Sequence, residues 1–563
     1  MFKYSALILF CVTTISKLHS QIVDLDPMQV ISIGEYKPVI VDATKIADKP
    51  VIVDSTKKLK VNGFSINNSK KVATGYDVAP IEAAEMVGEP LTKLYNGLVK
   101  IGFGNYTTPY GEAWYNHLRS KDYAYGVRLK HLSSQTNLED YGFGGFSDNE
   151  VSLYGKKFLK EHTLSGNFDY ARNVVHFYGY DTSLVDISDN ELTIQRFNLF
   201  AANAELKSHY AKAERYNHDV KLNFYNLQDT YKTSESNFKA NGYLQTAVLK
   251  ETLKINAAVD YYNYKTIQDT VNNTIITLNP NFIATGEKYR ASIGVTGVAD
   301  IFVKSKFYFY PNIDLSYNIV DNIIIPYAGA SGKLQKNSYK SLTDENPFVL
   351  SHLTMNNSNY KYEVFGGLRG TLSSTIAYDL RAAYSSIDNM ALYVNDTVSN
   401  SVVNANELVA NRFDVIYDDA ELLMFKGEIS YQQREKLRII LRGEYYNYKM
   451  SIEEKAWYKP QLKFSLSGNY NLRDKIVAKV DLYYIANQFA KTFVSDTTLS
   501  TGKRVVAQEL KGVFDANIAV EYRYTKKLGF FLTFNNITNF RYYRYNNYPT
   551  QRIGFMGGLS YSF

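Results

Sequence analysis

Cysteine is almost absent from this chain of 563 residues, and its single copy is Cys11. Cys11 lies within residues 1–20, so the rest of the chain offers no thiol for a disulfide or for a cysteine-ligated metal. No run of about 18 or more apolar residues occurs, which leaves no candidate for a transmembrane helix. These absences exclude a disulfide-stapled domain, a cysteine-ligated zinc protein and a helical membrane protein.

Residue clusters for catalysis or metal binding are also missing from the sequence. No two histidines are spaced as a metal-binding pair on one helix; they are His19, His117, His131, His162, His176, His209, His218 and His352. The stretch Gly329-Ala-Ser-Gly-Lys333 differs from a phosphate-binding loop, because Tyr327 stands where the first glycine is required. We therefore expect no enzyme, no cofactor and no metal site.

The N-terminus has the features of a secretory signal peptide. A short basic start at Met1–Lys3 precedes an apolar stretch at Ala6–Val12, which is too short to span a bilayer as a helix. A plausible cleavage site follows between Ser20 and Gln21. The pattern predicts an exported protein with a signal peptide over residues 1–20.

Aromatic residues are abundant, with 49 tyrosines and 31 phenylalanines. The mean hydropathy is −0.28 although 45% of the residues are hydrophobic. This mixture is typical of strands with one apolar and one polar face. The formal charge of +7 is spread without a basic block, so we expect no nucleic-acid partner.

Apolar and polar side chains alternate with a period of two along much of the chain. In the segment Phe514–Tyr524 the even positions are apolar or aromatic, whereas the odd positions include Asp515, Asn517, Glu521 and Arg523. The two arms around the turn Arg473–Lys475 alternate in the same way. In a membrane barrel the apolar face would meet lipid and the polar face would line a lumen.

Turn spacing gives the strand count. Ten polar turns are expected at Arg119–Asp122, Lys160–His162, Tyr210–Tyr216, Lys250–Glu251, Gly286–Lys288, Val320–Asn322, Leu372–Ser374, Arg434–Lys436, Arg473–Lys475 and Thr525–Lys527. The longest loops are expected near Asn337–Met355 and Asp388–Asp419. Short turns on one rim and long loops on the other are the pattern of outer-membrane barrels. We predict an all-β transmembrane antiparallel barrel of about 22 strands over residues 94–563, in the outer membrane of a Gram-negative bacterium.

Apolar and polar side chains also alternate at the C-terminal end of the chain. Aromatic and apolar residues close the last strand at Phe555, Gly557, Leu559, Tyr561 and Phe563. This pattern looks like the signal that the barrel-assembly machinery reads, so we expect that machinery and outer-membrane lipid among the partners.

Residues 21–93 have a different texture and are predicted to form a periplasmic extension. They hold a tandem near-repeat at Lys37–Lys45 and Lys49–Lys57, in which Pro-Val-Ile-Val-Asp recurs. Proline argues against a central strand, so the segment is either an extended, edge-pairing tail or a disordered spacer.

The barrel resembles the TonB-dependent receptor family over about Leu94–Phe563. The resemblance rests on the opening Leu94–Tyr106, on Phe534–Asn539 followed by Tyr542-Tyr543, and on the close at Phe555–Phe563. It implies a 22-stranded barrel. The segment Gln29, Val30, Ile31, Ser32 and Ile33 resembles the stretch by which such receptors engage a TonB-like protein. However, residues 21–93 are too few for that family's globular plug.

Three functions remain open at this stage. The first is import of a nutrient or chelate, with the long loops as the capture surface. The second is a passive channel. The third is a plugless structural subunit of a larger outer-membrane assembly or secretion complex, with a surface lipoprotein or other complex subunits as partners. Family resemblance favours import, and the repeated tail favours the subunit over the channel.

Overall fold

The computed structural model describes residues 94–117, 119–183, 190–210, 215–248, 251–302, 304–396, 411–495, 498 and 503–563. The predicted signal peptide with its cleavage site at Ser20 and Gln21, the TonB-box-like segment Gln29–Ile33 and the tandem repeat lie outside these residues. In the described part of the chain, no helix has the length and apolar character needed to cross a membrane.

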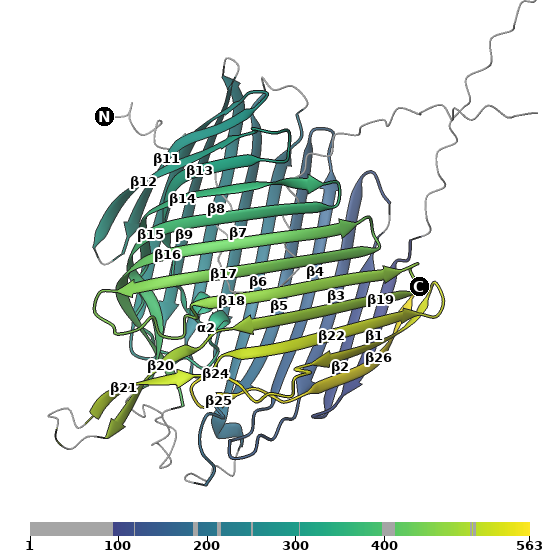
Figure 1. Ribbon diagram of the computed structural model, residues 1–563, viewed down its shortest axis with the longest axis vertical. Helices are drawn as coiled ribbons and strands as arrows, with labels where there is room; N and C mark the ends of the chain where they lie inside the picture. The colour runs from purple at the N-terminus through teal and green to yellow at the C-terminus, as the bar shows by residue number, and fades with distance from the viewer. Residues whose placement is uncertain are drawn as a thin grey trace, which may run out of the picture. The chain divides into compact units, whose positions relative to one another are not determined.

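The chain forms one closed antiparallel barrel of 22 strands, as predicted (Figure 1). The barrel strands are β1 (Gly97–Gly104), β2 (Thr108–Asn116), β3 (Tyr123–Ser134), β4 (Phe146–Phe158), β5 (His162–His176), β6 (Ile194–Ser208), β7 (Asn217–Gln228), β8 (Ser234–Val248), β9 (Glu251–Lys265), β10 (Thr270–Thr285), β11 (Tyr289–Ile301), β12 (Ser305–Tyr317), β13 (Ile325–Gln335), β14 (Ser358–Ser373), β15 (Ile376–Asn395), β16 (Phe413–Gln433), β17 (Leu437–Met450), β18 (Leu462–Leu472), β19 (Ile476–Ile485), β22 (Val513–Arg523), β23 (Leu528–Asn535) and β26 (Gly554–Ser562). Pairing of β26 with β1 closes the ring.

The remaining elements lie in the loops. They are the 3-10 helix η1 (Asn190–Thr193), the helix α2 (Tyr339–Glu345), the hairpin of β20 (Gln488–Ser495) with β21 (Lys503–Leu510), and the hairpin of β24 (Tyr543–Tyr545) with β25 (Tyr548–Pro549).

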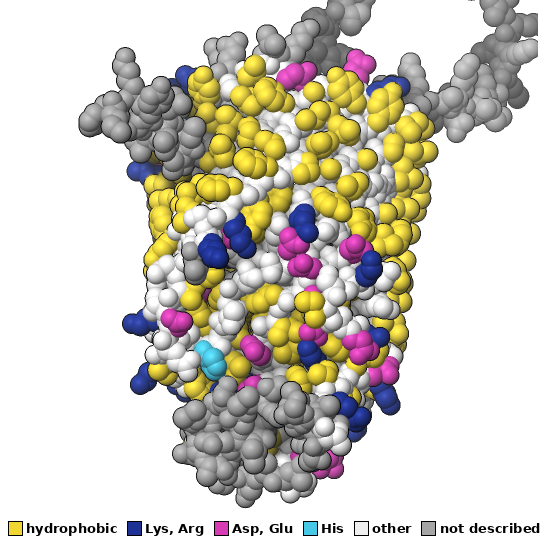
Figure 2. All heavy atoms as spheres, turned by 90° about the vertical axis from the view of Figure 1, so that its left-hand side faces the viewer, with side chains coloured by type: hydrophobic (Ala, Val, Ile, Leu, Met, Phe, Trp, Pro, Cys, Tyr) yellow, Lys and Arg dark blue, Asp and Glu magenta, His cyan; other side chains and the backbone are white. Residues whose placement is uncertain are grey.

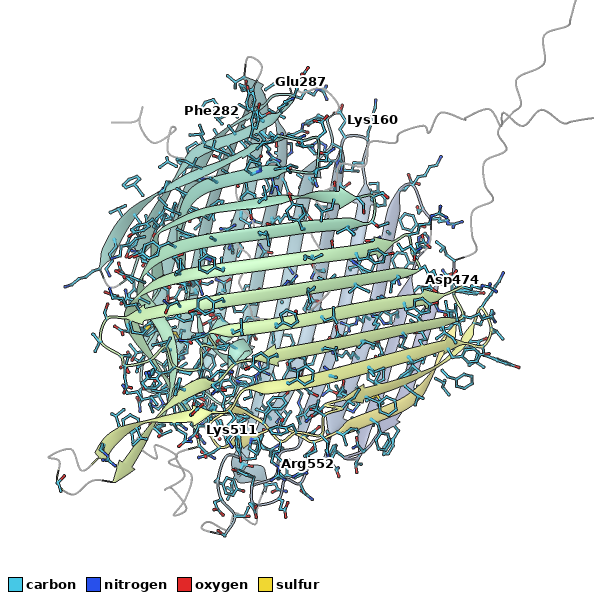
Figure 3. The ribbon with its side chains drawn as sticks, in the orientation of Figure 1. Lys160, Phe282, Glu287, Asp474, Lys511 and Arg552 are labelled. Carbon is cyan, nitrogen blue, oxygen red and sulfur yellow. The ribbon has the colours of Figure 1, made fainter. Side chains whose placement is uncertain are left out.

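All ten predicted turns fall where two consecutive strands meet at one rim of the barrel. We call this end the turn rim; Lys160, Glu287 and Asp474 mark it in Figure 3. Arg473 and Asp474 both have positive φ, of 52° and 58°, which is the backbone of a tight hairpin turn. The other end, marked by Lys511 and Arg552, is the loop rim.

One of the two predicted long loops is confirmed and the other needs correction. The loop at Asn337–Met355 is present between β13 and β14. The loop predicted over Asp388–Asp419 is shorter, because β15 continues to Asn395 and β16 begins at Phe413. Alternation fails in these strand ends because Leu392, Tyr393 and Val394 are all buried in succession, so packed loops cover both faces.

The lipid-facing side of the barrel is apolar. Side chains at every second position of the strands are exposed and hydrophobic, including Phe514 and Tyr522 of β22, while Asp515 points inward and is buried. Figure 2 shows one face of the barrel, with hydrophobic side chains over its upper half and most of the charged side chains in its lower half, towards the loop rim. An apolar band on a closed barrel indicates insertion in an outer membrane.

Aromatic rings pack over glycines in the strands where the barrel closes. Phe531 of β23 lies over Gly558 of β26 on the inner face, where an added Cβ would meet Phe531 Cζ at 2.3 Å. The ring of Phe563 covers Gly97 of β1, and the two residues exchange backbone hydrogen bonds of 3.0 Å. Glycine under an aromatic ring is a known device for stabilising sheet edges.

Candidate functional site

The loop between β13 and β14 folds into the barrel at the loop rim. We call residues 336–357 the cap. At its start Lys336 Nζ lies 2.8 Å from Asp260 Oδ1 of β9, and at its end Asn357 Nδ2 donates to the Asp300 carboxylate of β11 at 3.2 Å. Asp260 and Asp300 belong to the inward-facing rows of their strands, so both ends of the cap are anchored to the lumen wall.

The cap contains α2, a helix of one to two turns with a well-formed start. The Ser338 side chain accepts a hydrogen bond from Ser341 N, and the Ser341 side chain accepts one from Ser338 N. The Glu235 carboxylate of β8 accepts a hydrogen bond from Tyr339 N at 2.6 Å. Helix α2 is therefore fixed against the barrel wall, at the end of the barrel opposite the C-terminus (Figure 1).

A buried polar network joins the cap to β9 and to the loop between β7 and β8. Tyr264 Oη of β9 donates to Ser351 O at 2.8 Å and accepts from Leu353 N at 2.9 Å. Thr233 Oγ1 donates to the same Ser351 carbonyl at 2.8 Å, and Tyr339 Oη donates to Asp229 Oδ2 at 2.9 Å. Burial raises the pKa of the Asp229 carboxyl, which favours its neutral form in the closed structure.

The far side of the cap packs against loops from the other half of the barrel. Val349 forms a parallel bridge with Phe413, and the Phe348 ring stacks on Tyr548 with centroids 3.9 Å apart. The fully buried side chains in this cluster include Tyr339, Val349, Phe413, Trp457 and Tyr548. Burial of apolar surface in this cluster favours the packed arrangement of the cap.

An ion pair adds to this side. Lys459 Nζ, from the loop after β17, lies 2.8 Å from Glu345 Oε1 of α2. Burial alone would raise the pKa of the Glu345 carboxyl, but the Lys459 ammonium outweighs it and holds that pKa below its usual range. The cap thus contacts strands and loops on both sides of the loop rim and lies between them.

The inner wall away from the cap is polar and its charges are paired across strands. Arg128 of β3 lies 3.0 Å from Glu112 of β2 and 3.0 Å from Glu150 of β4. Similar cross-strand pairs are Lys221–Glu205, Arg381–Glu363 and Arg442–Glu428. A wall of this kind suits a wet lumen. Among the described residues, no group of three His, Cys, Asp or Glu side chains could hold a metal ion.

The predicted C-terminal insertion signal lies on the strand that closes the barrel. Phe555, Leu559, Tyr561 and Phe563 point outward and are exposed, and Gly557 lies in the same row. Their role in insertion stays a prediction. The sequence reasoning did not find the cap; the apolar run Phe348–Leu350 inside a predicted loop was the signal for it.

The comparisons with known proteins concern the fold. No protein-family model and no curated protein matches this chain. Among solved structures, the chain is similar to the FrpB iron transporter from Neisseria meningitidis, with a TM-score of 0.63, 9% identity and coverage of 84% of this chain and 82% of that one. It is also similar to the pyoverdine outer membrane receptor FpvA from Pseudomonas aeruginosa PAO1, with a TM-score of 0.62, 12% identity and coverage of 84% and 79%.

A third similar structure is the siderophore receptor PirA from Acinetobacter baumannii, with a TM-score of 0.63, 9% identity and coverage of 84% and 81%. These similar proteins are transporters and receptors. At such low identity the likeness concerns architecture. The chain has the 22-stranded barrel fold of outer-membrane siderophore receptors, which confirms at the level of the fold the resemblance found in the sequence.

Proposed function

We propose that this protein imports a nutrient or metal chelate through its lumen, and that the cap gates the passage. The observation that carries the proposal is the cap itself, an inward-folded loop held between the two sides of the loop rim, above a polar, charge-paired wall. In this proposal the buried contacts of the cap hold the passage shut until a ligand binds, which a steadily conducting channel does not need.

The cap is held in a way that a ligand could reverse. Its polar anchors are the hydrogen bonds to Tyr264, Thr233 and Asp229 and the ion pairs of Lys336 and Glu345. Each hydrogen bond contributes about 0.5–1.5 kcal/mol net, and a charged one about 1.5–3 kcal/mol. A ligand that binds the open form more tightly shifts the equilibrium by its difference in affinity for the two forms.

Energy for import would come from the periplasmic side. In this proposal residues 21–93 are periplasmic, and the segment Gln29–Ile33 meets a TonB-like protein. Iron chelates are the first ligand class to test, because the similar structures include an iron transporter and siderophore receptors.

A reversible cap lock tests the proposal. Val349 and Phe413 face each other in a parallel bridge, a geometry suited to a disulfide, and the only native cysteine is Cys11. Val349→Cys and Phe413→Cys would be combined in the native bacterium. Uptake of radioactive iron would then be measured with ferric citrate, a ferric hydroxamate and a ferric catecholate as probes.

The oxidised double variant should lose uptake of one probe, as a deletion strain does. Reduction should restore uptake to the level of the two single-cysteine variants, which report the cost of the substitutions themselves. Equal uptake in the oxidised and reduced states would contradict gating by the cap. A deletion strain that takes up every probe like its parent would contradict iron import.

A further inference from the structure

Strand β12 is only partly paired within the barrel. It pairs with β11 along its whole length, from Ile301↔Ser305 to Tyr289↔Tyr317. On its other side it pairs with β13 only from Asn312↔Ser331 to Ser316↔Tyr327. Residues 305–311 therefore present a backbone edge with no strand partner in the described part of the barrel.

The separation has a local cause. Pro311 lacks a backbone N–H, so the ladder loses a donor where the two strands part. Beyond this point β13 carries a bulge between Ser331 and Lys333 and turns inward. Leu334 then packs with Tyr310, whose hydroxyl donates to Asn359 Oδ1 of β14 at 2.7 Å. Tyr310 belongs to the inward-facing row of β12, so the end of β13 lies on the lumen side and leaves the edge of β12 uncovered.

The outward face beside the free edge is apolar. Phe307 and Phe309 point outward with 71% and 78% of their surfaces exposed. Across the sheet, Phe307 is in register with Ala299 of β11, and Ala299 with Ile276 of β10. Ile276 is in register with Val259 of β9. The row that contains Phe307 is apolar across these four strands, as expected for a surface in contact with lipid.

Lipid tails cannot hydrogen-bond to backbone N–H and C=O groups, so an open sheet edge in contact with lipid requires a polypeptide partner. We propose that residues 305–311 of β12 are the docking site for an extended segment of another outer-membrane protein or lipoprotein, which adds a strand beside Phe307 and Phe309. The added strand would carry apolar residues on its lipid-facing side.

A second copy of this chain does not fit the edge. Two identical strand edges pair antiparallel about a two-fold axis perpendicular to the sheet. In a barrel wall this axis lies in the plane of the membrane, so one of the two barrels would be inserted upside down. The partner is therefore a different polypeptide.

Photo-cross-linking in the native membrane tests the proposal. Benzoylphenylalanine would replace Phe307 or Phe309, with Phe282 of β10 as the matched control. Phe282 also points outward, with 54% of its surface exposed (Figure 3), but it is paired on both sides, to Ile293 and to Leu253. Each replacement adds a benzoyl group to a ring that already points outward and is largely exposed, and heat-dependent gel migration would verify that each barrel is folded.

We expect a cross-link to one other polypeptide from positions 307 and 309 and none from position 282. Because a strand advances two residues for each side chain on the same face, the cross-linked position on the partner should shift by two residues between the two probes. Phe309→Lys should reduce the co-purified partner by about tenfold or more, whereas Phe282→Lys should not, because an incoming strand would have to desolvate the lysine beside the edge.

Four outcomes would overturn the proposal. They are cross-links to residues 21–93 of the same chain, to a second copy, to lipid alone, or to scattered positions on many proteins. None of these readouts requires transport, so the docking edge and the import proposal can fail separately.

Discussion

The hydroxyl of Tyr264 holds the cap at two backbone points, so Tyr264→Phe should loosen the cap without unfolding the barrel. The Ser351 carbonyl would keep its hydrogen bond from Thr233, but Leu353 N would lose its acceptor. A buried N–H left without a partner costs about 1–3 kcal/mol. Taking about 2 kcal/mol, the open form should become about 30 times more populated.

Hydrogen exchange of the cap amides measures this population. If the cap opens and closes faster than its amides exchange, the Leu350 amide, which donates to Phe413 O and keeps that bond in the variant, should exchange about 30 times faster in Tyr264→Phe, in proportion to the open population. The matched control is Tyr261→Phe on the same strand, whose hydroxyl makes an exposed hydrogen bond to Asn272 at 3.1 Å. Unchanged exchange in Tyr264→Phe, or an equal change in both variants, would refute the role of Tyr264 as a cap anchor.

Two further predictions concern pH and the barrel seam. The raised pKa of Asp229 means that its carboxyl binds a proton more tightly in the closed cap than in the open cap. Protonation of Asp229 therefore stabilises the closed cap fully below the ordinary aspartate pKa, and this stabilisation is lost as pH rises through the raised value. The protection of the cap amides relative to their intrinsic exchange rates should therefore rise on acidification from neutral pH towards about pH 4. Asp229→Asn should remove the part of this dependence due to Asp229, and an unaltered pH profile in that variant would contradict the assignment. Gly558→Ala should displace Phe531 and destabilise the barrel by about 1–3 kcal/mol, seen as a lower temperature of heat-dependent gel migration. Gly155→Ala, where an added Cβ meets nothing within 4 Å, is the control, and equal shifts in the two variants would contradict the packing argument.

The transmembrane part of the fold could be predicted from the sequence, because the alternation that reveals each strand is imposed locally. Lipid lies outside every strand and a polar lumen lies inside, so side chains must alternate with a period of two wherever the wall crosses the membrane. Segments such as Phe514–Tyr524 and the hairpin around Arg473–Lys475 carry this pattern. The ten turns and the count of 22 strands followed from it.

The parts outside the lipid were not readable in this way. The ends of β15 and β16 near Tyr393 and Phe413 are strands buried on both faces, so their sequence lost the alternation and was mistaken for a loop. The hairpins β20–β21 and β24–β25, in the loops after β19 and β23, were missed for the same reason, since no common solvent imposes a pattern there.

The sequence by itself determined the class of the protein, the direction of its strands and the rim on which its short turns lie. These features depend on the lipid outside the barrel wall and the water inside it. Only the tertiary structure revealed the cap and the free edge of β12. The cap depends on contacts such as Tyr264 with Ser351 and Phe348 with Tyr548, between residues far apart in the chain. The free edge depends on where β13 goes after Gly332. Long-range contacts of this kind leave no periodic trace in a single sequence.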